Sequence, residues 1–290
     1  MSLASSNCFT LSELKIRQLL MLETFRLDGK CAVVTGSGRG LGRAMAVALA
    51  EAGAKVVIAA RTESQIKETM EIIKDSGGTA IPSVTDVTDS GDVNAMVDLC
   101  VESFGRIDIM IANAGGGGVS GNWDFWEYPD EAFETVIATN LKSNFYCGRA
   151  AAKYMVEQGD GGVIVNTSSG TALRGNKSFA YPTAKGGQIS LTKSMATILG
   201  PHNIRVNVII PGFVAQQPAA DERERALRER RGQNIPVRRI GEWWELGPLA
   251  VYLSSDASSY VTGQQFVIDG GGLAGGIGPS GFVPNTEGSQ

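Results

Sequence analysis

Histidine is almost absent from this chain. His202 is the only one among 290 residues, and it follows Leu199-Gly200-Pro201 at an apparent helix end. A capping or surface role suits a histidine there better than catalysis. The scarcity disfavours any mechanism that needs a histidine dyad or histidine metal ligands, and we expect no metal site.

Cysteine is also sparse, and its spacing is uninformative. The four cysteines are Cys8, Cys31, Cys100 and Cys147, and none belongs to a Cys-x-x-Cys pair. Neither a zinc site nor a disulfide framework is therefore indicated. We expect buried, reduced thiols.

Long apolar runs and a strong charge imbalance are missing as well. No stretch approaches the roughly 20 apolar residues that span a bilayer, and the run Leu19–Leu22 is too short for the core of a signal peptide. The formal net charge of −4 leaves no footprint for nucleic acid or anionic lipid. We therefore expect a small-molecule partner, no nucleic acid, no membrane and a cytoplasmic location.

Short apolar runs alternate with helix-period segments through most of the chain. Such alternation predicts an α/β fold, a Rossmann-type doubly wound parallel sheet in a single domain. The expected strands lie near 31–34, 56–58, 80–84, 107–112, 163–165, 204–209 and 266–268, and the expected helices near 41–52, 63–75, 90–103, 131–157, 181–199 and 244–254.

We expect the main domain over residues 28–271, preceded by an extension (1–27) and followed by a glycine-rich tail (272–290). Thr10-x-x-Glu13 resembles a capping box, so residues 11–25 form either a short amphipathic helix or a disordered leader. The tail either covers a neighbouring subunit or is disordered.

Two stretches interrupt the alternation, and both follow strands. Residues 115–128 are rich in glycine and then carry Trp123, Phe125 and Trp126; residues 213–244 include the charged run 221–231 and end in Trp243-Trp244. Loops at strand carboxyl ends bind ligands in open α/β sheets, so we expect substrate walls here. The alternative is a solvated charged helix with aromatic side chains packed beneath it.

A glycine-rich loop, Thr35-Gly-Ser-Gly-Arg-Gly-Leu-Gly42, separates the first expected strand from the first expected helix. Gly36, Gly40 and Gly42 allow a tight turn and close backbone approach, which leaves a pyrophosphate against a helix N-terminus. The strand–turn–helix context makes this pattern specific for a dinucleotide.

The end of the second strand indicates which dinucleotide binds. An acidic residue about 20 residues beyond the loop usually reads the adenosine ribose, but Ala60 and Arg61 stand there. Without a carboxylate there is no repulsion toward a 2′-phosphate, and Arg39 and Arg61 offer guanidinium forks for it. We expect NADP(H) rather than NAD(H), the alternative being a solvated Arg61.

Tyr181 and Lys185 form the most specific pair in the chain. Residues four apart share one face of a helix, so the Lys185 ammonium lies near the Tyr181 hydroxyl and favours its phenolate. This arrangement predicts acid/base chemistry without histidine.

Taken together, these motifs resemble the short-chain dehydrogenase/reductase family over about residues 28–271. The motifs, in order, are Thr35 to Gly42, Asp86-Val87, Asn113-Ala-Gly115, Asn140, Ser168-Ser169, Tyr181-x-x-x-Lys185 and Pro211-Gly212. The chain departs from common family patterns at Gln216, where a threonine often follows Pro-Gly, and at 242–248; both departures bear on substrate rather than on chemistry.

The resemblance implies roles for individual residues. The implied catalytic set is Asn140, Ser169, Tyr181 and Lys185, in which Asn140 holds a water that links Lys185 to solvent. The implied cofactor-binding set is Gly36, Ser37, Arg39, Gly40, Leu41, Gly42, Arg61, Asp86, Val87, Asn113, Ala114, Gly115, Tyr181, Lys185, Pro211, Gly212 and Val214.

Two adjacent serines compete for the catalytic role. The commonest family interval back from Tyr181 ends at Ser168, whereas alignment along the strand Gly162 to Thr167 selects Ser169. We prefer Ser169, because an insertion is easier to accept in a loop than inside a buried strand.

These inferences predict an NADP(H)-dependent oxidoreductase that acts on a ketone or secondary alcohol, with a sugar-type polyol as a close competitor. The named alternatives are a 3-oxoacyl thioester reductase and a regulator that senses NADP(H) without turnover. By family analogy we expect a dimer or tetramer formed through the helices at 131–157 and 181–199. Small residues such as Ala184 and Gly187 suit close helix approach, or equally packing against the chain's own sheet.

Overall fold

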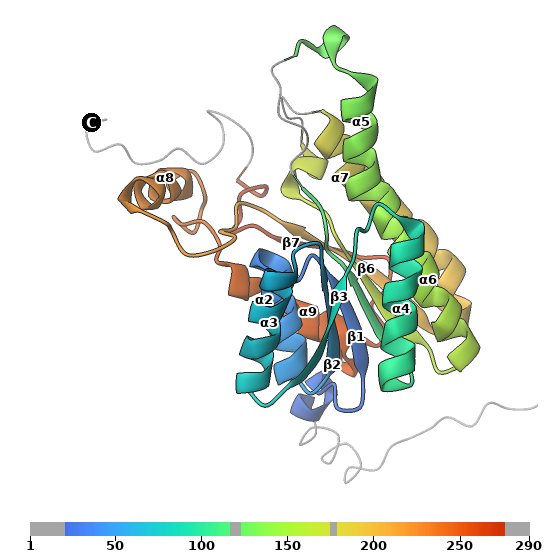
Figure 1. Cartoon of the computed structure of the whole chain (residues 1–290). Coiled ribbons are helices and arrows are strands. Elements are labelled where there is room, and N and C mark those ends of the chain that lie inside the picture. Colours follow the sequence, from blue (N-terminus) through green and yellow to red (C-terminus); the bar gives the residue numbers. More distant parts are fainter. Residues whose placement is uncertain (1–20, 117–122, 175–178, 276–290) are drawn as a thin grey trace, which may run out of the picture.

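A single parallel sheet organises the molecule. The computed structural model describes residues 21–116, 123–174 and 179–275, and their seven strands run in the order β3-β2-β1-β4-β5-β6-β7 (Figure 1). The strands are β1 (Cys31–Thr35), β2 (Lys55–Ala60), β3 (Thr79–Val84), β4 (Ile109–Ala112), β5 (Gly162–Thr167), β6 (Ile204–Pro211) and β7 (Gln265–Ile268). This confirms the predicted doubly wound α/β fold in one domain.

Helices cover both faces of the sheet. On one face lie α2 (Gly40–Glu51), α3 (Glu63–Asp75) and α9 (Leu246–Ser254); on the other lie α4 (Ser90–Phe104), α6 (Ser143–Gln158) and α7 (Ala180–Leu199) (Figure 1). Two helices lie outside these layers: α5 (Asp130–Ile137) and α8 (Glu222–Gly232). The short turns are η1 (Met21–Phe25), η2 (Phe125–Glu127), η3 (Ala138–Lys142), η4 (Gly170–Leu173), η5 (Gly200–His202), η6 (Trp243–Glu245) and η7 (Asp256–Ser258).

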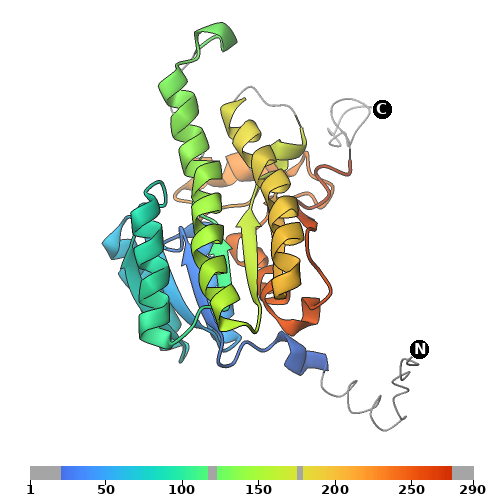
Figure 2. The same ribbon diagram turned by 90° about the vertical axis from the view of Figure 1, so that its right-hand side faces the viewer.

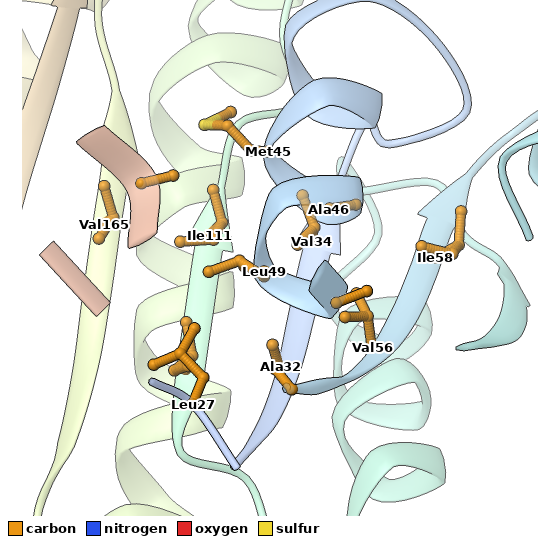
Figure 3. Close-up of a cluster of buried hydrophobic side chains, with 14 of the residues drawn as sticks. Leu27, Ala32, Val34, Met45, Ala46, Leu49, Val56, Ile58, Ile111 and Val165 are labelled. Atoms are coloured by element: carbon orange, nitrogen blue, oxygen red, sulfur yellow. The ribbon is translucent and has the colours of Figure 1, made fainter. Parts of the chain in front are cut away.

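The core on the α2 face shows why the strands read as continuous apolar runs. Met45 and Leu49 of α2 pack on Val34 and Ile111 from the sheet (Figure 3), and all four are fully buried. Parallel strands covered on both faces have no solvent side to carry polar residues. Each fully buried Leu or Met side chain contributes about 1.5–3 kcal/mol.

The long helix expected over 131–157 is interrupted by a π turn. Figure 2 shows α5, η3 and α6 as one rod that runs beside α7, with α5 projecting above the sheet. The π turn spans Ala138–Lys142, and the backbone oxygen of Asn140 inside it accepts a hydrogen bond from the Gln188 side chain of α7. Because Gln188 belongs to another helix, the periodicity of residues 131–157 alone does not predict the π turn.

 The segment 11–25, expected to be a short helix or a leader, lies only partly within the described residues. Residues 11–20 lie outside them, and residues 21–25 form the single 3-10 turn η1. Leu27, two residues further on, is 1% exposed and belongs to the α2-face core, and its backbone N–H donates to Ala52 O at 2.8 Å (Figure 3). The chain therefore enters its core one residue before the expected domain start. The tail beyond residue 275 also lies outside the described part.

Cys31, Cys100 and Cys147 are buried free thiols on the α4 face, as expected, while Cys8 lies outside the described residues. Burial raises the pKa of Cys100 and of Cys147 to about 12. Within the described residues, no three His, Cys, Asp or Glu side chains gather as metal ligands would. None of the helices described is both long and apolar enough to cross a membrane.

Candidate active site

The glycine loop between β1 and α2 has the backbone that its sequence predicts. Gly36 and Gly40 have φ of 66° and 59°, a region that favours glycine. A Cβ on Gly36 would lie 2.9 Å from Ala114 Cα, and a Cβ on Gly42 would overlap the Gly36 carbonyl oxygen. Glycine at these positions therefore lets the loop pack closely on itself and on the segment after β4, with the α2 N-terminus behind it.

Side chains from α2 and α3 hold this loop in place. Arg43 donates to Gly38 O at 2.5 Å and to Thr69 Oγ1 at 3.0 Å, and Thr69 donates to Ser37 O at 3.0 Å. The Ser37 hydroxyl turns inward, where it donates to Val34 O at 2.6 Å and accepts from Ala59 N at 3.0 Å. The Ser37 hydroxyl is thus engaged within the protein, and a ligand would meet the backbone of Ser37 rather than its side chain.

A cavity of about 820 Å³ opens above the carboxyl ends of the strands. Of the expected cofactor-binding residues, those that line it are Gly36, Arg39, Leu41, Gly42, Arg61, Asp86, Val87, Asn113, Ala114, Gly115, Tyr181, Lys185 and Val214. The structure brings these together from α2, α7 and the segments that follow β1, β2, β3, β4 and β6.

Four expected cofactor residues do not line the cavity: Ser37, Gly40, Pro211 and Gly212. The side chain of Gln216 lies against Gly40, and Gly212 is fixed to β7 by donating to Ile268 O at 3.0 Å. Pro211 is buried as the last residue of β6. These positions shape the segments around the cavity rather than its surface.

The segment after β4 is fixed beside the glycine loop by Thr35. Its Oγ1 accepts from the backbone N–H groups of Asn113 and Ala114, each at 3.0 Å, and Asn113 Nδ2 donates to Thr35 O at 3.0 Å. A Cβ on Gly115 would lie 2.7 Å from Asn140 Oδ1 and 3.2 Å from Lys185 Nζ. Glycine at 115 therefore lets the backbone pass close to both side chains.

Tyr181 and Lys185 share one face of α7, as their spacing predicts. Lys185 Nζ lies 5.6 Å from the centre of the Tyr181 ring and donates to Thr167 O at 2.8 Å. The lysine side chain is buried, and desolvation lowers the pKa of Lys185 to about 7. Thr167 Oγ1 beside it is buried without a hydrogen-bond partner among the described residues.

The pKa of Tyr181 shifts in the direction opposite to our expectation. Burial raises the pKa of the phenol, and a hydrogen bond with the Ser169 hydroxyl partly offsets that rise. The expected lowering relied on a fully charged Lys185, but burial also reduces the charge of the lysine near neutral pH. In the protein alone, desolvation therefore outweighs attraction between the pair.

The two adjacent serines have different partners. Ser168 is buried, and its hydroxyl donates to Lys185 O at 2.8 Å, which joins the end of β5 to α7. The Ser169 hydroxyl hydrogen-bonds with Tyr181 and accepts from Thr171 Oγ1 at 3.0 Å. Ser169 is thus the serine whose hydroxyl meets the tyrosine.

Asn140 sits in the π turn η3 and is almost fully buried. Its Nδ2 donates to Gly116 O at 3.0 Å and to Val136 O at 3.1 Å, and its Oδ1 accepts from Gly116 N at 3.0 Å. The side chain therefore ties α5 to the segment after β4. The Asn140 backbone oxygen, inside the turn, is held by Gln188.

Sequence reasoning missed Gln188, which is fully buried on α7. Its Nε2 donates to Asn140 O and, at 2.8 Å, to Asn144 Oδ1. Its Oε1 has no hydrogen-bond partner among the described residues. The available signal was an amide three residues after Lys185, within a helix face otherwise made of small and apolar residues.

The expected substrate walls are only partly in place. Phe213 and Gln216 line the cavity, but Trp243 and Trp244 line a separate hollow on the outer side of α2. This corrects our expectation for the tryptophan pair: the chain turns back after α8 and packs η6 against α2.

The aromatic residues after β4 also lie away from the cavity lining. Trp123 packs edge-on against Tyr128, and Phe125 against Phe179, at the top of α5 and α7. Trp126 is exposed. Residues 117–122, which precede this cluster, lie outside the described part of the chain.

The site fits a nicotinamide dinucleotide on its own geometry. The glycine loop lines the cavity through Gly36 and Gly42, Asp86 and Val87 line it from the segment after β3, and Tyr181 lines it from α7. Arg39 and Arg61 are exposed on the lining, and within the described residues neither joins an ion pair.

Comparison with known proteins gives consistent matches. A family model described as enoyl-(acyl carrier protein) reductase matches residues 36–272. A 2-dehydro-3-deoxy-D-gluconate 5-dehydrogenase from Escherichia coli is 38% identical over 262 residues, covering 88% of this chain and 100% of the relative. A 3-oxoacyl-(acyl-carrier-protein) reductase from Thermotoga maritima is 34% identical over 247 residues, covering 85% and 98%.

A solved structure shows the same fold. It is a 7α-hydroxysteroid dehydrogenase in complex with NADH and 7-oxo glycochenodeoxycholic acid, and it matches with a TM-score of 0.79 at 32% identity. The match covers 87% of this chain and 97% of that one.

Proposed function

This chain belongs to the short-chain dehydrogenase/reductase family, and from that membership we propose that it is an NADP(H)-dependent oxidoreductase that interconverts a ketone and a secondary alcohol. The observation that carries the proposal is the Tyr181 hydroxyl, which hydrogen-bonds with Ser169 on a helix that also places Lys185 beside the ring. A proton donor and a buried amine on the cavity lining thus lie together, with a second hydroxyl bonded to the donor.

Each of these residues has a part in carbonyl reduction. The bound cofactor supplies the hydride. Tyr181, whose pKa is raised, keeps its proton at neutral pH and donates it to the carbonyl oxygen, and the Ser169 hydroxyl hydrogen-bonds that same oxygen. Lys185, with a pKa of about 7, gains or loses its own proton readily as the phenol changes charge. In the oxidative direction, Tyr181 takes the proton of the alcohol.

The preference for NADP(H) is supported by charge at the end of β2. Ala60 and Arg61 line the cavity where a carboxylate would repel a 2′-phosphate, and Arg39 lines it from the glycine loop. The steroid dehydrogenase of similar structure was solved with NADH, so the family as such does not decide between the cofactors. Our proposal rests on these side chains.

The substrate is a small ketone or alcohol, and two classes compete. The similarity to a sugar-acid dehydrogenase favours a sugar-type polyol or its oxidised form. The similarity to a 3-oxoacyl reductase, and the description of the matching family model, favour an acyl thioester as the second candidate. A regulator that binds NADP(H) without turnover is the remaining alternative, and oxidation of NADPH with any member of a carbonyl panel separates an enzyme from it.

We also propose a homo-oligomer. Phe145 on α6 and Ile198 on α7 are exposed apolar side chains on the two helices that we expected to pair. Two small residues of α7 instead pack within the chain: Ala184 is fully buried, and a Cβ on Gly187 would meet Leu141. Any pairing therefore relies on the exposed side chains rather than on those two.

Replacement of Tyr181 tests the proposed reaction. Tyr181→Phe should lower kcat by a factor of about 10²–10⁴, because it removes the proton donor, while the dissociation constant of NADPH changes little. Steady-state kinetics and calorimetric titration measure the two quantities. A variant that retains most of its activity would refute the assignment.

The two serines provide a matched pair of variants. Ser169→Ala should lower kcat by a factor of about 10²–10³, because it removes a donor to the carbonyl oxygen. Ser168→Ala removes an anchor for Lys185 O and should affect thermal stability more than kcat. The opposite ranking of the two kcat values would assign the catalytic role to Ser168.

A further inference from the structure

Helix α8 turns one of its faces toward the cavity. The cavity-lining residues of α8 are Glu224, Leu227, Arg228 and Arg231. Their spacing of three, four and seven residues places them on a single side of the helix. Arg225 and Arg230, on the other sides, are exposed and do not line the cavity.

Apolar packing does not explain the position of α8. Gly232 is its only buried residue, and Leu227 is the only large apolar side chain in the helix. Its ends are fixed instead: Asp221 Oδ1 accepts from Glu224 N at 2.7 Å, and a Cβ on Gly232 would lie 2.7 Å from Arg239 Cα. A helix with so little buried apolar surface is held beside the cavity by its caps and connections.

The inner face of α8 adds positive charge to a cavity that is already basic. Apart from the phenol of Tyr181, the ionisable side chains on the lining are Arg39, Arg61, Asp86, Lys185, Glu224, Arg228 and Arg231. The Arg228 side chain is 16% exposed and is held by Glu224, with Nη2 and Oε1 2.5 Å apart. Arg231 joins no ion pair in the described part of the chain. Basic side chains thus outnumber acidic ones around a cavity that suits an anion.

The location of α8 favours the nucleotide over the substrate as that anion. Figure 1 shows α8 above the side of the sheet covered by α2 and α3, across from α5 and α7. The segment that leads into α8 also touches the phosphate loop, since the Gln216 side chain lies against Gly40. The helix thus faces the phosphate-binding half of the cavity.

We propose that Arg228 and Arg231 bind phosphate oxygens of NADP(H), so that α8 forms a second basic wall of the cofactor site. Guanidinium groups bind phosphates through paired, charge-assisted hydrogen bonds. Glu224, which pairs with Arg228, competes with the phosphate for it. This inference rests on the proposed function, because it presumes a nicotinamide dinucleotide in the cavity.

The test measures cofactor affinity in the full-length chain. Arg228→Gln and Arg231→Gln are compared with Arg230→Gln, which removes the same charge from the outer side of α8. Calorimetric titration with NADPH should show affinities at least about tenfold weaker for the first two variants, as expected for a lost hydrogen bond to a charged group. The Arg230→Gln affinity should stay within about twofold of the original, and Glu224→Gln should bind NADPH at least as tightly.

Titration with NADH identifies the phosphate involved. Weaker binding of NADPH alone assigns the arginines to the 2′-phosphate, and equal weakening for both cofactors assigns them to the pyrophosphate. The proposal is overturned if both inner-face variants bind as Arg230→Gln does, or if they change only the KM of the carbonyl substrate. If the unmodified chain binds NADPH but reduces no carbonyl, the proposed function fails, while the ranking of the variants still decides the role of α8.

Discussion

Lys185 is an ionisable side chain in a place where charge is costly. It is 3% exposed, and desolvation lowers its pKa from the ordinary value of 10.5 to about 7. At a pH between about 7 and 10.5, Lys185 holds a proton in the unfolded chain that it has released in the folded chain. The stability lost through this group is therefore largest at pH 7 and below, and it is recovered as the pH rises toward 10.

Lys185→Met should reveal this cost. The difference in unfolding free energy between the original chain and the variant should shift by roughly 2–3 kcal/mol in favour of the original between pH 7 and pH 9.5. Urea denaturation of both proteins without cofactor, at each pH, measures it, and Lys193→Met on the exposed side of α7 serves as the control. A difference that does not change with pH would show that Lys185 titrates normally.

At the scale of elements, the π turn η3 connects the long α5–α6 rod to the active site. It places Asn140 against the segment after β4, and the Gln188 side chain of α7 bonds the backbone oxygen that lies within the turn. The same amide bonds Asn144 on α6. One buried side chain thus links α7, which carries Tyr181 and Lys185, to both halves of the rod.

Gln188→Leu should lower stability by about 1–3 kcal/mol, because it leaves buried acceptors without donors. It should also lower kcat while the KM of the substrate changes little, since Asn140 loses its fixed position. Thr192→Val is the matched control: the Thr192 hydroxyl belongs to the same buried network but bonds Asn166 and Gln188 O. If both variants are less stable and both keep the kcat of the original chain, Gln188 has only a structural role.

The elements also show what the sequence could predict. The strands and most helices were recovered to within a few residues, because parallel strands and amphipathic helices depend on local apolar periodicity. The π turn depends on Gln188, which is distant in sequence, and the position of η6 depends on contact with α2. Within the site, motif spacing located Tyr181 and Lys185, whereas the shift in the pKa of Tyr181 follows from burial, which spacing does not determine.

On the scale of the whole molecule, the core extends one residue beyond the expected domain boundary. Leu27→Ala should destabilise the protein by about 2–5 kcal/mol, because truncation of this fully buried leucine leaves a cavity in the core of the α2 face. Leu22→Ala, at a position 74% exposed, should change stability by no more than about 0.5 kcal/mol. Chemical denaturation of the two variants checks this, and equal small effects would place Leu27 outside the folded unit.

The three buried thiols have a consequence for experiments on the intact protein. Thiolate is the reactive form of cysteine, and burial raises the pKa of Cys31, Cys100 and Cys147. A thiol reagent therefore reaches them only when the layer formed by α4 and α6 separates from the sheet. In a Cys8→Ser background, the rate of labelling becomes an internal measure of how often that layer opens, and slower labelling in the presence of a ligand reports that the ligand stabilises the closed fold.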